Sequence, residues 1–516
     1  MRVWILSLAL LLGCAHQPLQ VGAGYDVTEK SVAALQADMA AGRISSQQLV
    51  AAYVARIRTL DERGPALHSV LALNSNADDD ARRLDDERKA GKLRGPLHGI
   101  PILLKDNIES AEPLPTTAGS LALLANVSGR DAPIVARLRD AGAIVLGKAN
   151  LSEWANIRSK YSTSGWSAVG GSTKNPYDLE RNPCGSSSGS GAAVAANLTT
   201  LAIGTETNGS ITCPASVLGL VGLKPTLGLV SRTHIIPIST MQDTAGPLAR
   251  TVEDAAVLLQ VIAGEDPEDP ATFGADARKR DYLAELTKTT LAGRRLGVLK
   301  SKTGFLPAVD ALFDQALQQL TAAGAELTQV ELSADVDAIE ARELTVLITD
   351  FRDQLNAYLA AAPPAVRVRT LAELITFNSD EAARELVYFG QDLFVAAEAT
   401  AGYDPHAYSQ LREANRKAAA DALDSLLTQH RLDALIAPTL SPAWKTDLVN
   451  GDHVLSSVST LPAVAGYPHL TVPMGQVSGL PVGLSFIGPA WSDATLLALG
   501  YSFEQRTRMR RPPALR

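Results

Sequence analysis

Two serine-bearing loops and one lysine are the parts of this chain best suited to chemistry. The first loop, residues 183–191, reads PCGSSSGSG, and the second, residues 204–212, reads GTETNGSIT. Lys105 follows the apolar run IPILL, and no histidine lies near either loop in sequence. Because a serine hydroxyl is a weak nucleophile without an adjacent base, the pattern predicts a serine activated by a lysine, with a second serine passing the proton. The lysine must be neutral for this role, so burial must lower its pKa.

The second loop holds the better candidate nucleophile, Ser210. The apolar run 201–203 predicts a short strand that leads into the loop, and Gly204 permits tight backbone geometry. An ordinary strand-to-loop turn is the alternative interpretation, and Ser187 is the nucleophile to consider if Ser210 is not. In a tight turn the N–H groups before and at the serine can converge on one point, as an oxyanion hole requires. They belong to Thr207, Asn208, Gly209 and Ser210.

The first loop also matches G-x-S-x-G, the nucleophile elbow of α/β-hydrolases, over residues 185–189. That elbow must follow an apolar strand, whereas the preceding residues 175–183, NPYDLERNP, are typical of a loop. A flexible Gly/Ser linker is the other interpretation, but the helix-like run AAVAA that follows argues against it. We therefore expect this loop to lie over a helix N-terminus, where free backbone N–H groups gather.

Taken with the upstream segment PLHGIPILLKDNI and the 24-residue spacing of Ser186 and Ser210, these loops resemble the amidase signature family. The resemblance extends from about residue 26 to the C-terminus. It implies a Ser–cisSer–Lys catalytic group with Ser210 as nucleophile, Ser186 as bridging serine and Lys105 as base. Within the family, several stretches are similar to bacterial peptide amidases. They are RGPLHGIPILLKDNI (94–108), NLSEWAN (150–156), PCGSSSGSG (183–191), QDTAGPLAR (242–250), AGYPHLTVPMG (465–475) and EQRTRMRRPP (504–513).

This resemblance implies an α/β fold, a single three-layer α/β/α domain with a central mixed sheet, over residues 25–516. It implies hydrolysis of carboxamides to acid and ammonia through an acyl-enzyme, with C-terminal amides of peptides as substrates and no metal or organic cofactor. Three alternatives stay open. They are an amidase of other small neutral amides, a non-catalytic amide-binding envelope lipoprotein, and an ammonia-donating subunit of a larger complex.

Two positions near the motifs need separate interpretation. Many family members carry arginine after G-S-I, where this chain has Thr212. A guanidinium there could grip a substrate carboxylate, so its absence favours a neutral, longer substrate and weakens the amidotransferase alternative. Asp243 either supports the active site or caps a turn. Asp106, beside Lys105, need not face the same side, because alternate strand residues point to opposite faces.

Composition describes an ordinary globular enzyme, with 46% hydrophobic and 20% charged residues in 516. No repeat, heptad pattern or long linker divides the chain, and we expect a monomer. The net charge of −8 argues against a nucleic-acid partner. None of the eight histidines stands in a metal-binding pattern such as H-E-x-x-H.

The first residues predict export and a lipid anchor. An apolar run of ten residues, 3–12, follows Met1-Arg2 and fits a signal peptide, being too short to span a bilayer. It ends in Leu11-Leu12-Gly13-Cys14, which resembles a bacterial lipobox, so residues 1–13 would be removed and Cys14 acylated. A plain signal peptide with a chance cysteine is the alternative. Residues 14–24 would form a tether, and the outer membrane is favoured because no aspartate follows Cys14.

The two other cysteines flank the candidate serines. Cys184 lies two residues before Ser186, and Cys213 lies three residues after Ser210. If the serines meet, the cysteines are neighbours as well. In an oxidising compartment they could form a disulfide, or they could be small buried residues in a tight site.

Alternating helical and strand patterns predict helices on both faces of one mixed sheet. The helical section at about 335–430 is expected to shape the substrate entrance. A surface loop is expected over 265–276. One predicted helix begins at Ser46, and another covers 135–140. A third follows the N-cap residue Thr251 and reaches residue 262, and the last covers 492–505. The predicted strands lie at 143–146, 296–299, 432–437 and 479–488.

Overall fold

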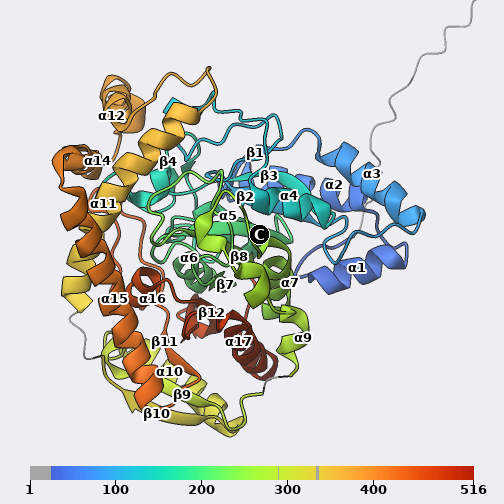
Figure 1. Ribbon diagram of the computed structural model, residues 1–516. Helices are drawn as coiled ribbons and strands as arrows, with labels where there is room; N and C mark the ends of the chain where they lie inside the picture. Colours follow the sequence, from blue (N-terminus) through green and yellow to red (C-terminus); the bar gives the residue numbers. More distant parts are fainter. Residues whose placement is uncertain (1–24, 289, 333–335, 516) are drawn as a thin grey trace, which may run out of the picture.

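The computed structural model describes residues 25–288, 290–332 and 336–515 (Figure 1). The predicted signal peptide at residues 1–13, the tether at 14–24 and the acylated Cys14 all lie outside the described residues. Within the described ranges, no helix is both long enough and apolar enough to cross a membrane.

Eleven strands of the described residues pair into one mixed sheet, in the order β1-β3-β2-β6-β8-β7-β12-β13-β11-β9-β10. Parallel pairs join β3, β2 and β6 toward one end and β11, β9 and β10 at the other. Antiparallel pairs fill the middle and add β1 at the edge beside β3. A separate hairpin pairs β4 with β5. The strand bounds are β1 (Val70–Leu73), β2 (Pro101–Lys105), β3 (Ile144–Ala149), β4 (Trp166–Ser167), β5 (Gly171–Ser172), β6 (Leu201–Glu206), β7 (Val221–Lys224), β8 (Thr244–Ala249), β9 (Arg295–Leu299), β10 (Glu326–Val330), β11 (Ala434–Pro438), β12 (His469–Val477) and β13 (Leu480–Ile487).

Helices flank this sheet (Figure 1). Short 3-10 turns lie between them, and a π-helical turn, η1 (Ile57–Asp61), extends α2. The helix bounds are α1 (Val32–Ala40), α2 (Ser46–Arg56), α3 (Ala77–Lys89), α4 (Pro133–Asp140), α5 (Ser188–Ala195), α6 (Thr212–Val217), α7 (Val252–Ile262), α8 (Ala275–Arg278), α9 (Tyr282–Leu286), α10 (Pro307–Ala322), α11 (Val336–Ala361), α12 (Leu371–Asp380), α13 (Ala382–Glu385), α14 (Asp392–Glu398), α15 (Pro405–Gln429), α16 (Thr460–Ala465) and α17 (Asp493–Thr507).

The strands that carry the candidate site are buried along their whole length. All residues of β2 (PILLK), β3 (IVLGKA) and β6 (LAIGTE) are buried. Parallel strands covered on both faces read as continuous apolar runs, and these three do until their last residues. Polar residues at the ends of such strands therefore lie inside the protein, where only specific partners can satisfy them.

The fold confirms the predicted α/β architecture and most predicted elements. The helix predicted at Ser46 begins there as α2, with Ser45 and Gln48 forming a capping box. Thr251 caps α7 through a hydrogen bond to the Asp254 N–H, as predicted. The segment 265–276 differs from the expected loop because it contains the 3-10 turn η4 (Pro270–Thr272), capped by Asp269, and the start of α8.

The section at 335–430 is helical, as predicted, and contains α11 to α15. Its apolar faces form a cluster of their own, in which Phe351 stacks on Phe394 at 5.2 Å between ring centroids. Trp154 joins this cluster from the segment after β3, edge-on to Phe394. The helical section is thus packed onto the residues that follow the site-bearing strands.

Candidate active site

Neighbouring parallel strands bring the lysine and the second serine loop to one edge of the sheet. β2 pairs with β6 in the register Ile102↔Leu201 to Leu104↔Ile203, so both chains leave the sheet at the same end. Lys105 is the last residue of β2, and the loop 207–211 follows β6 directly. A Cβ on Gly204 would lie 2.8 Å from Ser187 Oγ, so the first loop packs against the strand at the glycine itself.

Lys105 is fully buried and has three oxygen partners. Its Nζ lies 2.7 Å from Ser186 Oγ, 2.8 Å from Thr205 Oγ1 and 3.1 Å from the Thr205 carbonyl oxygen. Asn107 donates from Nδ2 to the same Thr205 hydroxyl at 3.0 Å. The predicted base and the predicted bridging serine are therefore in direct contact.

Burial lowers the pKa of Lys105 to about 7, and the nearby carboxyls of Asp243 and Glu206 only partly oppose this shift. The desolvated ammonium loses hydration that the protein does not replace in full, which favours the neutral amine. Asp106 does not pair with Lys105. It accepts hydrogen bonds from the Thr117 N–H and hydroxyl, and Lys148 is its cationic neighbour. Asp106 thus has partners of its own, in line with the expectation that it need not face the same side as Lys105.

The first loop carries the cis peptide between Gly185 and Ser186 and leads into α5, as predicted for a loop over a helix N-terminus. Three of its other hydroxyls donate to backbone carbonyls: Ser187 to Thr205, Ser188 to Cys184, and Ser190 to Ile203, at 3.1, 2.7 and 3.1 Å. Ser187 Oγ also accepts from the Thr205 N–H. Ser187, the second candidate nucleophile, is thus held by the backbone of β6.

Ser210 sits beside the first loop through a backbone contact. The Ser210 carbonyl oxygen accepts a hydrogen bond from the Ser187 N–H at 3.2 Å, and Ser210 is 8% exposed. This contact ties the predicted nucleophile to the neighbour of Ser186. The sharp turn before it uses Gly209 at φ 79°, a conformation that suits glycine.

Glu206, at the end of β6, organises this turn, and sequence reasoning missed it. One carboxylate oxygen accepts from the Gly209 N–H at 2.9 Å, and the other accepts from the N–H groups of Ile211 and Thr212 at 2.8 and 3.0 Å. The Gly209 N–H, expected to point into an oxyanion hole, therefore has a different acceptor. The N–H groups of Thr207, Asn208 and Ser210 are not among the donors to Glu206, so they stay candidates for the oxyanion hole.

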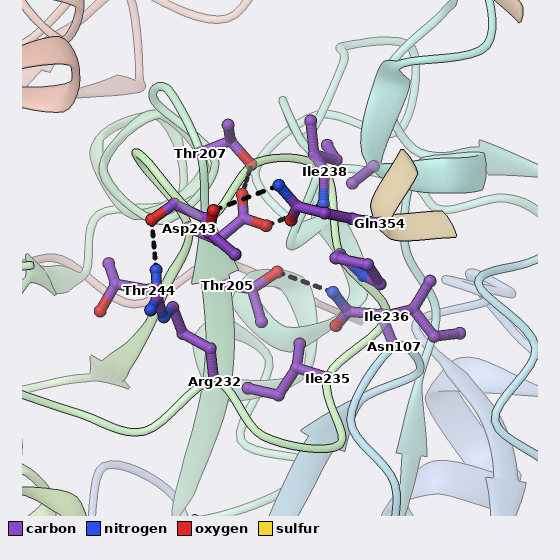
Figure 2. A pocket seen from close by; sticks show the side chains of 13 residues that line it. Asn107, Thr205, Thr207, Arg232, Ile235, Ile236, Ile238, Asp243, Thr244 and Gln354 are labelled. Carbon is purple, nitrogen blue, oxygen red and sulfur yellow. Dashed lines mark hydrogen bonds between the residues drawn. The ribbon is translucent and has the colours of Figure 1, made fainter. Parts of the chain in front are cut away.

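Asp243 caps a turn, one of the two roles considered for it, and it also contacts Thr207, one of the predicted oxyanion residues. One oxygen accepts from the Thr207 hydroxyl at 2.6 Å, and the other accepts from the Ile238 and Ser239 N–H groups. Burial raises its pKa to about 6. Figure 2 shows Thr207 and Asp243 pointing toward each other at a pocket beside the site.

That pocket has a volume of about 80 Å³ and a mixed lining. Its apolar lining includes Ile235, Ile236 and Ile238, and its polar lining includes Asn107, Thr205 and Asp243 (Figure 2). Gln354, from α11, is part of the lining and donates to Thr240 Oγ1, another lining residue. The helical section thus contributes to the surroundings of the site.

Cys184 and Cys213 form a disulfide, with their Cα atoms 6.0 Å apart. The bond joins the loop of Ser186 to the first turn of the helix that follows Ser210. Of the two outcomes considered for these cysteines, the structure contains the bond. Among the described residues, no group of three or more His, Cys, Asp or Glu side chains could hold a metal ion.

Comparison with known proteins identifies the family of this chain. The profile of the Amidase family matches residues 48–497. A probable amidase of Arabidopsis thaliana is 39% identical, over 99% of this chain and 96% of its own. A glutamyl-tRNA(Gln) amidotransferase subunit of Symbiobacterium thermophilum is 35% identical, over 93% of this chain and 97% of its own.

Solved structures show the same relationship. Native peptide amidase from Stenotrophomonas maltophilia is 51% identical and superposes with a TM-score of 0.88, over 95% of this chain and 99% of that one. The family match covers most of the chain, and the fold agrees over nearly all of it. The chain therefore belongs to the amidase signature family and is an amide-hydrolysing enzyme.

Proposed function

We propose that the protein hydrolyses carboxamides to acid and ammonia with Ser210 as nucleophile, Ser186 as bridging serine and Lys105 as base. The observation that carries this proposal is the 2.7 Å contact between Lys105 Nζ and Ser186 Oγ in a fully buried setting. A neutral amine has two N–H donors and one lone pair. Thr205 supplies two acceptors for the donors, which leaves the lone pair for the Ser186 proton.

The proposed reaction has two acyl-transfer steps, acylation of Ser210 and hydrolysis of the resulting ester. Lys105 takes the Ser186 proton while Ser186 takes that of Ser210, whose Oγ bonds to the amide carbon. The resulting oxyanion is held by backbone N–H groups of Thr207, Asn208 and Ser210, since Gly209 donates to Glu206. The C–N bond then breaks as the relay returns the proton to nitrogen, and ammonia leaves. Water repeats the attack on the ester and releases the acid.

C-terminal amides of peptides are the substrate class that we propose. Similarity to the Stenotrophomonas maltophilia peptide amidase supports this class. Thr212 supports it too. Many family members have an arginine at this position, which could bind a substrate carboxylate, whereas here the Thr212 hydroxyl lies 3.3 Å from Glu206. Other small neutral amides are the second candidate. An ammonia-donating subunit, suggested by the amidotransferase relatives, is the remaining one.

Replacing the nucleophile tests the proposal. Ser210→Ala should lower the rate of ammonia release at least ~10²–10⁴-fold, the loss typical of removing a catalytic group. The melting curve should be unchanged. The purified protein alone should release ammonia from peptide amides in a panel that also holds free Gln, free Asn and aryl amides. Near-normal turnover by the folded variant would reject Ser210 and turn attention to Ser187. Turnover of glutamine only would favour the amidotransferase-like alternative.

We also propose that the enzyme is exported and anchored in the bacterial outer membrane through a lipid on Cys14. The lipobox-like Leu11-Leu12-Gly13-Cys14 motivates this proposal. The disulfide between Cys184 and Cys213 supports export, because such bonds persist in oxidising compartments and are rare in the cytosol.

A further inference from the structure

A buried glutamate on α11, Glu343, contacts the turn that holds the predicted oxyanion donors. Its Oε1 accepts from Asn208 Nδ2 at 3.0 Å and from Gln242 Nε2 at 2.6 Å, and its Oε2 lies 3.1 Å from the same Asn208 nitrogen. Glu343 is 5% exposed, and within the described ranges no lysine or arginine pairs with it. Two neutral amides from the catalytic side are therefore its hydrogen-bond donors.

One of these donors, Gln242, also holds the Thr207–Asn208 peptide group. Gln242 Nε2 also donates to the Thr207 carbonyl at 3.2 Å, so this nitrogen bridges the peptide to Glu343. In a trans peptide the C=O and the following N–H point in opposite directions. Holding the Thr207 carbonyl toward Gln242 therefore directs the Asn208 N–H away from it. The side chain of Asn208 is held at the same time, by Glu343 and by Ser459 Oγ at 2.6 Å.

From these contacts we infer that Glu343 is a positioning residue, which aims the Asn208 N–H at the oxyanion and couples the helical section to acyl transfer. The inference rests on the proposed function, because it assigns a purpose to one of the proposed oxyanion donors. Glu343 is 135 residues from Asn208 in sequence and does not belong to any of the motifs. Burial raises the pKa of Glu343 to about 7, which is consistent with a carboxyl that has no cationic partner.

The carboxylate is chemically suited to this role in a way that an amide is not. It presents two acceptors to two N–H donors, so every contact is satisfied. In Glu343→Gln one acceptor becomes an NH₂ group that faces the Asn208 NH₂ group, and two donors oppose each other. In Asn208→Asp two carboxylates would face each other instead. Combining the two substitutions restores complementarity, since the amide introduced at position 343 can donate to the carboxylate introduced at position 208.

A kinetic cycle on the full-length enzyme tests the inference. We expect Glu343→Gln to lower kcat for a peptide amide about 10- to 100-fold with KM within about twofold, less than the ~10²–10³-fold lost with a whole oxyanion donor. Asn208→Asp should be impaired at least as much. The double variant Glu343→Gln/Asn208→Asp should recover at least about tenfold over the poorer single variant. Asp337→Asn, at an exposed position in the first turn of the same helix, removes the same charge and should keep the parental kcat.

A second readout separates this inference from the proposed function. The rate at which a fluorophosphonate probe labels Ser210 is measured on the same variants, with melting curves to show that each is folded. If the parent is labelled but releases no ammonia from peptide amides, the substrate proposal fails while the labelling rates still test Glu343. Parental kcat and labelling rate in Glu343→Gln, or no recovery in the double variant, would overturn the positioning role. A parent that is neither labelled nor active would overturn both.

Discussion

Lys105 must be neutral before it can accept a proton, and its burial makes that possible near physiological pH. Because burial lowers its pKa to about 7, the fraction of neutral amine falls about tenfold per pH unit below that value. We therefore expect kcat/KM to rise with pH through about 7 and then to level off. A pH–rate profile on a peptide amide measures this, and a flat profile down to pH 4 would contradict a lysine base.

Substitutions of Lys105 and Ser186 test the proposed proton relay directly. Lys105→Ala and Ser186→Ala should each cost ~10²–10⁴-fold in the acylation rate, and the double variant should be little worse, since the residues act as one unit. Independent, multiplying losses would mean that the 2.7 Å contact does not carry the proton.

At the residue scale, the sequence indicated the candidate catalytic residues but not most of the side chains that hold them. Lys105, Ser186 and Ser210 stand in recognisable motifs, and turn capping was one of the two roles considered for Asp243. Glu206 lies inside a motif, yet its function depends on a carboxylate folding back onto three N–H groups of its own loop. Glu343 lies in a segment without motifs, and only the tertiary fold brings it to Asn208.

At the scale of elements, local sequence signals predicted helices and strands but could not predict the order of the strands in the sheet. Ser45 and Thr251 cap helices by contacts within a few residues, which is why those starts could be predicted. The adjacency of β2 and β6 joins residues about a hundred positions apart, and no periodicity in the sequence encodes it. Family resemblance supplied this adjacency indirectly, by implying that Lys105 and the serines meet.

The disulfide is the covalent link between the two serine-bearing elements. It closes a loop with a sequence separation of 29 residues, and removing a loop closure of this size should cost about 2–4 kcal/mol of unfolding free energy. We expect Cys184→Ala/Cys213→Ala to unfold at a lower urea concentration than the oxidised parent, and to match the parent under reducing conditions. Equal urea midpoints for the oxidised parent and the variant would show that the bond does not stabilise the fold.

At the scale of the whole molecule, the proposed anchor lies far in sequence from the catalytic loops. Native protein should carry lipid on Cys14 as its first residue, and Cys14→Ser should lose that lipid. Intact mass and detergent partitioning measure both. A chain beginning at residue 24 should keep the parental kcat and KM, because the site is built from residue 105 onward. An unmodified Cys14 in the aqueous phase would show that the lipobox-like sequence is a coincidence.

The backbone hydrogen bonds of Ser187, Ser188 and Ser190 have a consequence for the proposed acyl-enzyme. An ester on Ser210 lies beside a loop with several further serines, and acyl groups migrate readily between adjacent free hydroxyls. Ser187, Ser188 and Ser190 donate their protons to backbone carbonyls, and they have no lysine to remove those protons. Migration onto any of them would first have to break a buried hydrogen bond, which is costly. In the proposed mechanism these three serines are therefore expected not to take up the acyl group, although they are chemically identical to the nucleophile.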